Sequence, residues 1–372
     1  LWKKDLICQG TRVMPFSTAL GTVLSNFEAG QNYQDVQDPA ITVMFKLQDE
    51  EAYIAAWTTT PWTLPSNLCL CAGADIDYVK IKDADKDIEF YMAKALVPNF
   101  EKKRNLSILS EHKGSEFLGK KYLPLFPYFK DREKDGAFQI LNDGYVTVEA
   151  GTGFVHIAPG FGEDDNRVMK EAGLKEVFAC PVNDQGEFTN EVPDYAGRYV
   201  KEADKDIIKR LKAEDKLYEQ SVLVHSYPFC YRSDTPLIYK SIPSWYVRVE
   251  KIKEDLITSN NQIRWVPEHL KDGRFGKWLE GARDWSISRN RIWGTPLPIW
   301  KNESNGKFIC MGSVEELAKY TGKTLTDLHR ESVDPLEFKV DGEEGSYKRI
   351  TEVLDCWFES GSMPYAQLHY PF

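Results

Sequence analysis

Hydrophobic and polar residues alternate along much of the first half of the chain, with the two-residue period of a half-buried β-strand. Around Asn142-Asp143-Gly144, a tripeptide that favours tight turns, we predict a hairpin of residues 138–141 and 145–148. The early part of the chain is therefore expected to be rich in β-structure. The alternation predicts further strands over residues 41–47, 52–57, 68–72, 78–81 and 88–92.

Helical periodicity replaces this alternation in shorter stretches. Residues 201–218 are the clearest case, because Ile207, Ile208 and Leu211 recur at helical spacing between charged residues. We interpret those charges as a solvated face. Short strands with scattered helices indicate an α/β fold. Shorter helices are predicted over residues 164–170, 251–258, 274–279 and 314–320.

The predicted strand at residues 52–57 runs into an unusual stretch, WTTTPWTLPSN, at residues 57–67. Pro61 and Pro65 cannot donate to a β-ladder, so a central strand cannot continue through them. The stretch therefore predicts a strand that ends in a rigid turn with hydroxyl groups along it. The alternative is that the threonines are ordinary strand residues.

A second stretch, GTGFVHIAPGFGEDDN at residues 151–166, predicts a short strand between two glycine-rich turns. Gly151 and Gly153 allow the backbone to approach a neighbour closely. His156 lies in the middle of the strand, and an acidic pair follows the second turn. His156 alone is also compatible with a buried core histidine, and the acidic pair with a helix start stabilised by the helix dipole.

Together the two stretches resemble the editing domain inserted in isoleucyl-tRNA synthetases, and we assign the eukaryotic cytosolic type. Valyl and leucyl enzymes carry Thr-Thr-Arg-Pro at the start of the first motif, whereas here Pro61 and Trp62 follow the threonines. A valyl-type editing domain is kept as the alternative within the family. Residues 283–289 and 355–362 extend the resemblance through the last third of the chain.

The resemblance implies a β-barrel-like editing domain with surrounding helices, flanked by segments of the class I synthetase core junction. We place the junction at residues 1–26, the editing domain at residues 27–240 and a return segment at residues 241–372. A small insertion is expected near residues 301–350. The chain begins without Met, which suggests a piece of a longer protein.

The implied activity is hydrolysis of valine wrongly esterified to the isoleucine tRNA. The motif match gives Asp165 the substrate ammonium, and Thr59, Thr60 and His156 the orientation of the attacking water. Such an ester is activated, so positioning and electrostatics suffice without a strong nucleophile. Asn67 is assigned to the terminal adenosine.

Two further residues of the first motif are assigned to substrate binding, Trp57 and Thr58. Thr58 is the weaker candidate for catalysis, because strict alternation points it away from Thr59. Alternation also places Thr60 on the face of Thr58, so a catalytic Thr60 requires the turn to have begun there.

No cofactor is expected in this segment. The His-Ile-Gly-His-type and Lys-Met-Ser-Lys-Ser-type motifs of nucleotide activation are missing from the sequence, so ATP and Mg²⁺ are assigned to the full-length parent alone. A metal-dependent hydrolase built on His156, Asp164 and Asp165 is the rival interpretation. We expect no metal, since no further ligand stands at a recognisable spacing.

Charge and cysteine content limit the partners and the compartment. A net charge of −10 argues against a stand-alone nucleic-acid binder, and seven scattered cysteines favour a reducing, cytoplasmic compartment. Basic residues and tryptophans mix within residues 264–291, which suits RNA contact or an ordinary core. Expected partners are the 3′ acceptor end of the isoleucine tRNA, mischarged valyl-tRNA and the rest of the parent, without a membrane. A non-catalytic tRNA-binding module remains the functional alternative.

Overall fold

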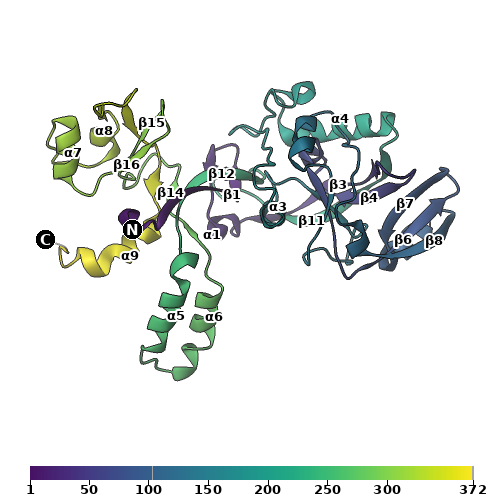
Figure 1. Cartoon of the computed structure of the whole chain (residues 1–372), viewed down its shortest axis with the longest axis horizontal. Coiled ribbons are helices and arrows are strands. Elements are labelled where there is room, and N and C mark those ends of the chain that lie inside the picture. The colour runs from purple at the N-terminus through teal and green to yellow at the C-terminus, as the bar shows by residue number, and fades with distance from the viewer. Residues whose placement is uncertain (103, 371–372) are drawn as a thin grey trace. The chain divides into compact units, whose positions relative to one another are not determined.

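The computed structural model describes residues 1–102 and 104–370. Two compact units emerge from the packing. The larger unit is Arg12–Ile242, and the smaller combines Leu1–Thr11 with the chain from Pro243 onward. Strands β1 (Ile7–Ser17) and β12 (Ile238–Val247) carry the chain from one unit to the other (Figure 1).

A six-stranded sheet forms the body of the larger unit, in the order β11-β3-β4-β7-β6-β8 (Figure 1). Neighbouring strands are antiparallel except for β4 and β7, which run parallel. The alternation over residues 41–47, 52–57, 78–81 and 88–92 correctly predicted β3, β4, β6 and β7, whose buried residues belong to one hydrophobic core, but it did not predict β8. The strands are β3 (Tyr33–Lys46), β4 (Tyr53–Thr58), β6 (Asp77–Asp83), β7 (Ile88–Ala93), β8 (Leu106–Lys113) and β11 (Leu217–Pro228).

A second sheet of three strands has β5 (Cys69–Ala72) between β9 (Ile140–Asn142) and β10 (Phe154–Ile157). The hairpin predicted around residues 142–144 is wrong, because β9 pairs in parallel with β5, and residues 145–148 form no strand. Asp143 explains the difference. Its backbone N–H donates to the Ala72 carbonyl, and its carboxylate accepts from the Tyr145 N–H, which turns the chain away from β9.

The fold class is α/β, as predicted, but the barrel-like description was too specific. Within the described part of the chain the sheets are open and none closes into a barrel. The six-stranded sheet ends at β11 on one side and at β8 on the other. The larger unit also contains β2 (Thr22–Val23), α1 (Asn26–Ala29), α2 (Val97–Glu101), α3 (Glu163–Glu171) and α4 (Val200–Ala213).

Helix α4 packs its apolar side, which includes Ile207 and Leu211, into the core. It ends earlier than the predicted limit of residue 218. Asp215 takes a left-handed φ of 54°, and the Lys216 N–H caps the carbonyl of Leu211. The chain then enters β11, the edge strand beside β3.

In the smaller unit, residues near 301–350 form a sheet with its own core around Trp300, Phe338 and Tyr347. Helices α5 (Lys253–Asn261) and α6 (Arg274–Glu280) make a separate hairpin (Figure 1). No helix among the described residues is long and apolar enough to span a bilayer. The remaining elements are β13 (Trp285–Ser286), β14 (Ser288–Arg289), β15 (Ile299–Asn302), β16 (Phe308–Cys310), α7 (Val314–Thr321), α8 (Arg330–Val333), β17 (Glu337–Phe338), β18 (Tyr347–Arg349), β19 (Val353–Leu354) and α9 (Cys356–Ala366).

Candidate active site

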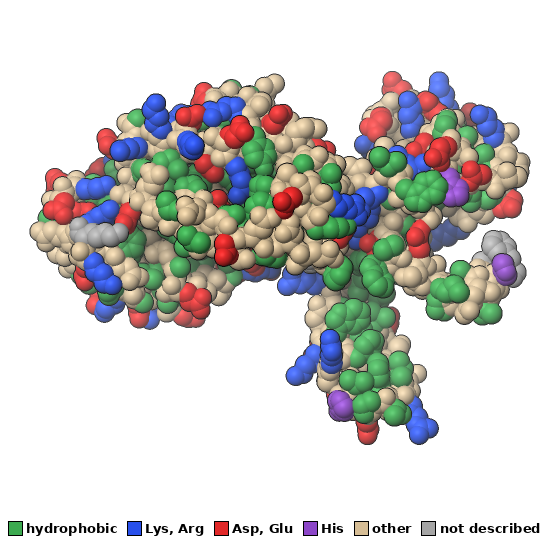
Figure 2. Space-filling view, turned by 180° about the vertical axis from the view of Figure 1, so that it is seen from behind, with side chains coloured by type: hydrophobic (Ala, Val, Ile, Leu, Met, Phe, Trp, Pro, Cys, Tyr) green, Lys and Arg blue, Asp and Glu red, His purple; other side chains and the backbone are tan. Residues whose placement is uncertain are grey.

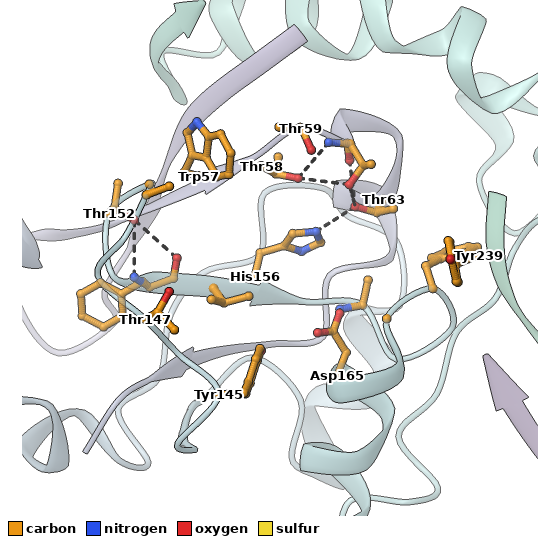
Figure 3. A pocket seen from close by; sticks show the side chains of 18 of the residues that line it. Trp57, Thr58, Thr59, Thr63, Tyr145, Thr147, Thr152, His156, Asp165 and Tyr239 are labelled. Carbon is orange, nitrogen blue, oxygen red and sulfur yellow. Dashed lines mark hydrogen bonds between the residues drawn. The ribbon is translucent and has the colours of Figure 1, made fainter. Parts of the chain in front are cut away.

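A pocket of about 530 Å³ in the larger unit brings the two sequence motifs together (Figure 3). Its walls come from the end of β4, the 3₁₀ turn that follows, the loop before β10, β10 itself and the start of α3. Threonines and aromatic rings make up most of the lining, which also contains the imidazole of His156 and the carboxylate of Asp165. The lining residues used below are Trp57, Thr58, Thr59, Thr60, Trp62, Thr63, Tyr145, Gly151, Gly153, His156, Asp165, Tyr227 and Tyr239.

The strand-ending turn forms as predicted. Strand β4 stops at Thr58, and Pro61–Ser66 fold into a 3₁₀ helix whose residues are all buried. The Trp62 N–H donates to Asp204 Oδ1 of α4 at 2.8 Å, and the Trp62 ring meets Phe161 edge-on at 4.9 Å between centroids. The turn is therefore held rigidly against α4.

A chain of hydroxyl groups runs along this turn. Thr58 Oγ1 lies 3.2 Å from Thr60 Oγ1, which lies 3.3 Å from Thr63 Oγ1. The Thr60 N–H donates to Thr58 Oγ1 at 3.1 Å. The turn has begun by Thr60, which is the condition for its catalytic role, and Thr58, Thr59 and Thr60 all line the pocket. The Thr59 hydroxyl has no hydrogen-bond partner among the described residues.

His156 forms a hydrogen bond with Thr63, the last residue of this chain of hydroxyl groups (Figure 3). Its Nε2 lies 2.8 Å from Thr63 Oγ1, and its Nδ1 lies 3.3 Å from Asn67 Nδ2. Tyr122 donates its hydroxyl to Asn67 Oδ1 at 2.7 Å, which turns the amide nitrogen of Asn67 toward the ring. Nδ1 therefore accepts, so the ring proton belongs on Nε2 and is donated to Thr63.

Burial lowers the pKa of His156 to about 4, so the imidazole is neutral at pH 7. Both ring nitrogens are already occupied. His156 is thus a satisfied, 7% exposed histidine that also forms a pocket wall, which unites the two interpretations left open by the sequence. This arrangement suits positioning and shape better than proton abstraction.

Asn67 lies elsewhere than the sequence led us to expect. It is 5% exposed and is not among the pocket-lining residues. Its Nδ2 also donates to the Cys69 carbonyl at 2.8 Å. Because this side chain is buried behind His156 and occupied by four neighbours, its placement favours orienting the imidazole over contact with an adenosine.

Asp165 faces the pocket from the first turn of α3 (Figure 3). Its Oδ2 accepts the Ala158 N–H at 2.8 Å. Burial, helped by the negative charge of Asp164, raises the pKa of this carboxyl to about 7. Asp164, by contrast, is exposed and pairs with Arg167 at 3.2 Å. The structure therefore separates two adjacent carboxylates that the sequence could not distinguish by position alone.

The glycine-rich loop approaches its neighbours closely, as predicted. A Cβ on Gly153, whose φ is +81°, would lie 2.4 Å from the Cβ of Ala93. A Cβ on Gly151 would lie 3.2 Å from that of Trp57. Only glycine lets this loop pack closely against Trp57 and form part of the pocket wall.

Sequence reasoning missed several lining residues. Thr63 stands inside the first motif, so its hydroxyl and its spacing from Thr60 were a usable signal. Tyr227 and Tyr239 had none, because they reach the pocket from β11 and β12, and Tyr145 lies just before the second motif. No three His, Cys, Asp or Glu side chains within residues 1–102 and 104–370 are placed to share a metal ion.

The mixed basic and aromatic stretch of residues 264–291 lies partly in the α5–α6 hairpin, whose surface carries hydrophobic side chains flanked by charges (Figure 2). Trp265 has a structural role, since its indole N–H donates to Asn260 Oδ1 at 2.9 Å and its ring packs on Phe275. Trp278 is 65% exposed. RNA contact here stays a prediction.

Comparison with known proteins adds the following. The family described as "tRNA synthetases class I (I, L, M and V)" matches residues 1–372. The chain is 56% identical over its whole length to "Isoleucine--tRNA ligase" of Bdellovibrio bacteriovorus and 52% identical to "Isoleucine--tRNA ligase, cytoplasmic" of Mus musculus. It spans 35% and 30% of those relatives. Since the bacterial identity is no lower than the mouse one, these matches do not single out the eukaryotic cytosolic type.

Two solved structures resemble about half of the chain. One is described as "GlLeuRS-CP1", with a TM-score of 0.38 and 16% identity over 49% of this chain and 98% of that one. The other is the P. falciparum cytosolic leucyl-tRNA synthetase editing domain, with a TM-score of 0.37 and 8% identity over 49% of this chain and 99% of that one.

Proposed function

This chain belongs to the class I tRNA synthetases (I, L, M and V), and from that premise we propose that it is the editing segment of an isoleucine–tRNA ligase. Its reaction is hydrolysis of the ester between valine and the isoleucine tRNA. The observation that carries the proposal is one pocket with a hydroxyl chain on one side and the Asp165 carboxylate on the other.

Each half of that pocket meets one chemical need of the substrate. The α-ammonium requires a negative partner. Asp165 is the less exposed of the two lining carboxylates, the other being Glu149, and no described cation pairs with it. The ester carbonyl requires a positioned water, and the unpartnered Thr59 hydroxyl is available to hold it. Thr60, Thr63 and His156 keep Thr59 and its turn in place through their mutual hydrogen bonds.

Hydrolysis then needs little further from the protein. The water oxygen bonds to the carbonyl carbon and the bond from that carbon to the ribose oxygen breaks. One of the water's protons ends on the ribose oxygen, and the other leaves with the valine carboxyl group, which releases it to solvent. Holding an activated ester against a positioned water lowers the barrier chiefly by removing the entropic cost of encounter. Because His156 is neutral and both of its ring nitrogens are hydrogen-bonded, it contributes by holding the neighbouring groups in place.

Selectivity follows from size. A synthetic site gains only about 1–3 kcal/mol against a substrate that lacks one methylene, so it cannot reject valine well. A second pocket can instead admit valine and exclude isoleucine sterically. The walls here are stiff, because β-branched threonines have few rotamers and His156 is bonded at both nitrogens.

The remaining assignments belong to the same proposal. The partners are the 3′ end of the isoleucine tRNA and the rest of the parent synthetase, in the cytoplasm. The segment uses no cofactor or metal, and ATP and Mg²⁺ serve the parent's synthetic site. A eukaryotic cytosolic source stays a prediction of the sequence.

The test is deacylation by the isolated chain of tRNA carrying valine or isoleucine. We expect rapid loss of valine, little loss of isoleucine, and no isoleucine-dependent exchange of pyrophosphate into ATP. Binding without hydrolysis would instead support a non-catalytic tRNA-binding module. A preference for the valine tRNA would indicate the valyl type.

A further inference from the structure

A second hollow of about 600 Å³ lies in the larger unit between α4, β3 and β11. Four lysines of α4 line it, at positions three or four residues apart that place them on one face of the helix. Pro39, Ile208 and Val222 supply apolar surface. We call this hollow the lysine groove; its lysines are Lys201, Lys205, Lys209 and Lys212.

Three of these lysines lack a carboxylate partner. Lys205, Lys209 and Lys212 are exposed and form no ion pair within the described part of the chain. Neighbouring cations behave differently: Arg210 on the same helix pairs with Asp194 at 2.7 Å, and Lys216 pairs with Glu214 at 2.6 Å. Uncompensated positive charge in a row is unusual in a chain of net charge −10.

The acidic groups of the groove do not cancel that row. Asp38 lies 3.6 Å from Lys201 and 3.0 Å from His225 Nε2, so it is already paired. Asp204 is buried and accepts the Trp62 N–H. The outer part of the lysine groove is therefore positively charged.

The lysine groove and the active-site pocket share a wall. Lys201 Nζ lies 4.0 Å from the ring centre of Tyr227, and Tyr227 lines the pocket. Asp204 lines the groove and holds Trp62, which lines the pocket. A chain that occupies the groove therefore arrives directly beside the reacting end.

We propose that the lysine groove binds the phosphate backbone of the single-stranded nucleotides that precede the esterified 3′ end. This inference rests on the proposed function and identifies how the rest of the nucleic acid is held. Lysines one helical turn apart are about 6 Å from one another along the axis, which suits successive contacts with a flexible polyanion. Gln37 and Gln220 also line the groove, but the lysine contacts go to phosphate and carry no sequence information, so we expect binding to depend mainly on charge.

The test replaces Lys205, Lys209 and Lys212 together by Gln, which preserves helix propensity and removes three charges. Each single-strand phosphate contact contributes about 0.7 to the slope of log affinity against log salt concentration. We therefore expect the slope of log KM against log salt concentration to be smaller by about 2 in the variant than in the wild type. At about 50 mM salt the KM for mischarged tRNA should rise roughly tenfold to several-hundredfold, with kcat unchanged.

Two controls make the result specific. A matched triple variant, Lys121→Gln with Lys130→Gln and Lys134→Gln, removes three exposed charges that lie outside both hollows and form no ion pair with any described residue. It should leave KM almost unchanged. The groove variant should hydrolyse valine esterified to adenosine alone at the wild-type rate, because that substrate has no preceding phosphate.

An unchanged KM and salt slope for tRNA would overturn the proposal, as would an equal loss with the adenosine ester. If the wild-type chain hydrolyses neither substrate, the proposed function fails, and fluorescence anisotropy with a labelled single-stranded RNA hexamer tests the groove separately. Weaker RNA binding by the groove variant supports the proposal. Unchanged RNA binding with loss of an acidic-peptide probe overturns it in favour of a protein partner.

Discussion

Replacing Asp165 by Asn removes the negative charge from the active-site pocket while keeping an oxygen that can accept the Ala158 N–H. This choice is better than Ala, which would also leave that buried N–H without a partner. We expect Asp165→Asn to fold normally and to lose most of its deacylase activity, because the substrate ammonium would then enter the pocket without a counter-charge.

The magnitude follows from charge separation in a partly desolvated site. An ammonium about 4 Å from a carboxylate gains about 4 kcal/mol at an effective dielectric constant of about 20. Removing one member of such a pair costs about 2–5 kcal/mol. That range corresponds to a decrease of roughly 30- to 5,000-fold in kcat/KM.

The pH profile provides a second, sharper measurement. Because the pKa of Asp165 is raised to about 7, wild-type kcat/KM should rise with pH until the carboxylate is ionised near pH 7. It should fall again as the substrate ammonium loses its proton, near the ordinary α-amino pKa of about 7.7–8.0. In Asp165→Asn the rising limb should disappear.

Asp164→Asn is the matched control, since it removes an adjacent carboxylate that is exposed and paired with Arg167. Activity should stay within about threefold, a loss of less than about 0.7 kcal/mol. The rising limb should move to lower pH, because the Asp164 charge contributes to the raised pKa of Asp165. Near-normal turnover in Asp165→Asn, or an equal loss in both variants, would refute the assignment.

Three further predictions concern selectivity, stability and metal. His156→Ala should enlarge the pocket and allow hydrolysis of isoleucyl-tRNA; parallel decreases for valine and isoleucine would limit His156 to chemistry or structure. Burial raises the pKa of Asp204 to about 7, so the folded state holds this proton more tightly than the unfolded state and stability falls as pH rises from about 4 to 7. Asp204→Asn can still accept the Trp62 N–H, so its free energy of unfolding, measured by chemical denaturation, should equal that of the wild type at pH 4. At pH 8 it should be higher than that of the wild type by up to about 4 kcal/mol. Equal destabilisation at both pH values would contradict this. Chelator treatment should leave deacylation unchanged, whereas a loss restored by zinc would revive a metal-dependent mechanism.

Local patterns determined much of what was predicted correctly. The two-residue alternation predicted β3, β4, β6 and β7 of the six-stranded sheet, because alternate residues of a strand point to the same face. Pro61 ended β4 since it lacks an amide proton, and Gly153 allowed the close approach beside Ala93.

Other features required long-range contacts. The turn tripeptide at residues 142–144 suggested a hairpin, but β9 gains its hydrogen bonds by pairing with β5, about seventy positions earlier, in the register Leu70 with Ile140. A short stretch of sequence does not show which distant strand it will pair with, because the pairing energy depends on which strand is nearby in space. The position of Asn67 behind His156 was hidden for the same reason.

The sequence by itself determined that this protein is an α/β chain with a hydroxyl-rich turn, a histidine strand and an acidic helix start. Only the tertiary structure decided that Asp165 faces the pocket while Asp164 faces Arg167, and that four lysines of α4 line a groove instead of a simple solvated surface. Adjacent residues of identical chemistry differ only in direction and surroundings. Those surroundings are assembled from distant segments, so desolvation, pKa and unpaired charge appear only after the chain has folded.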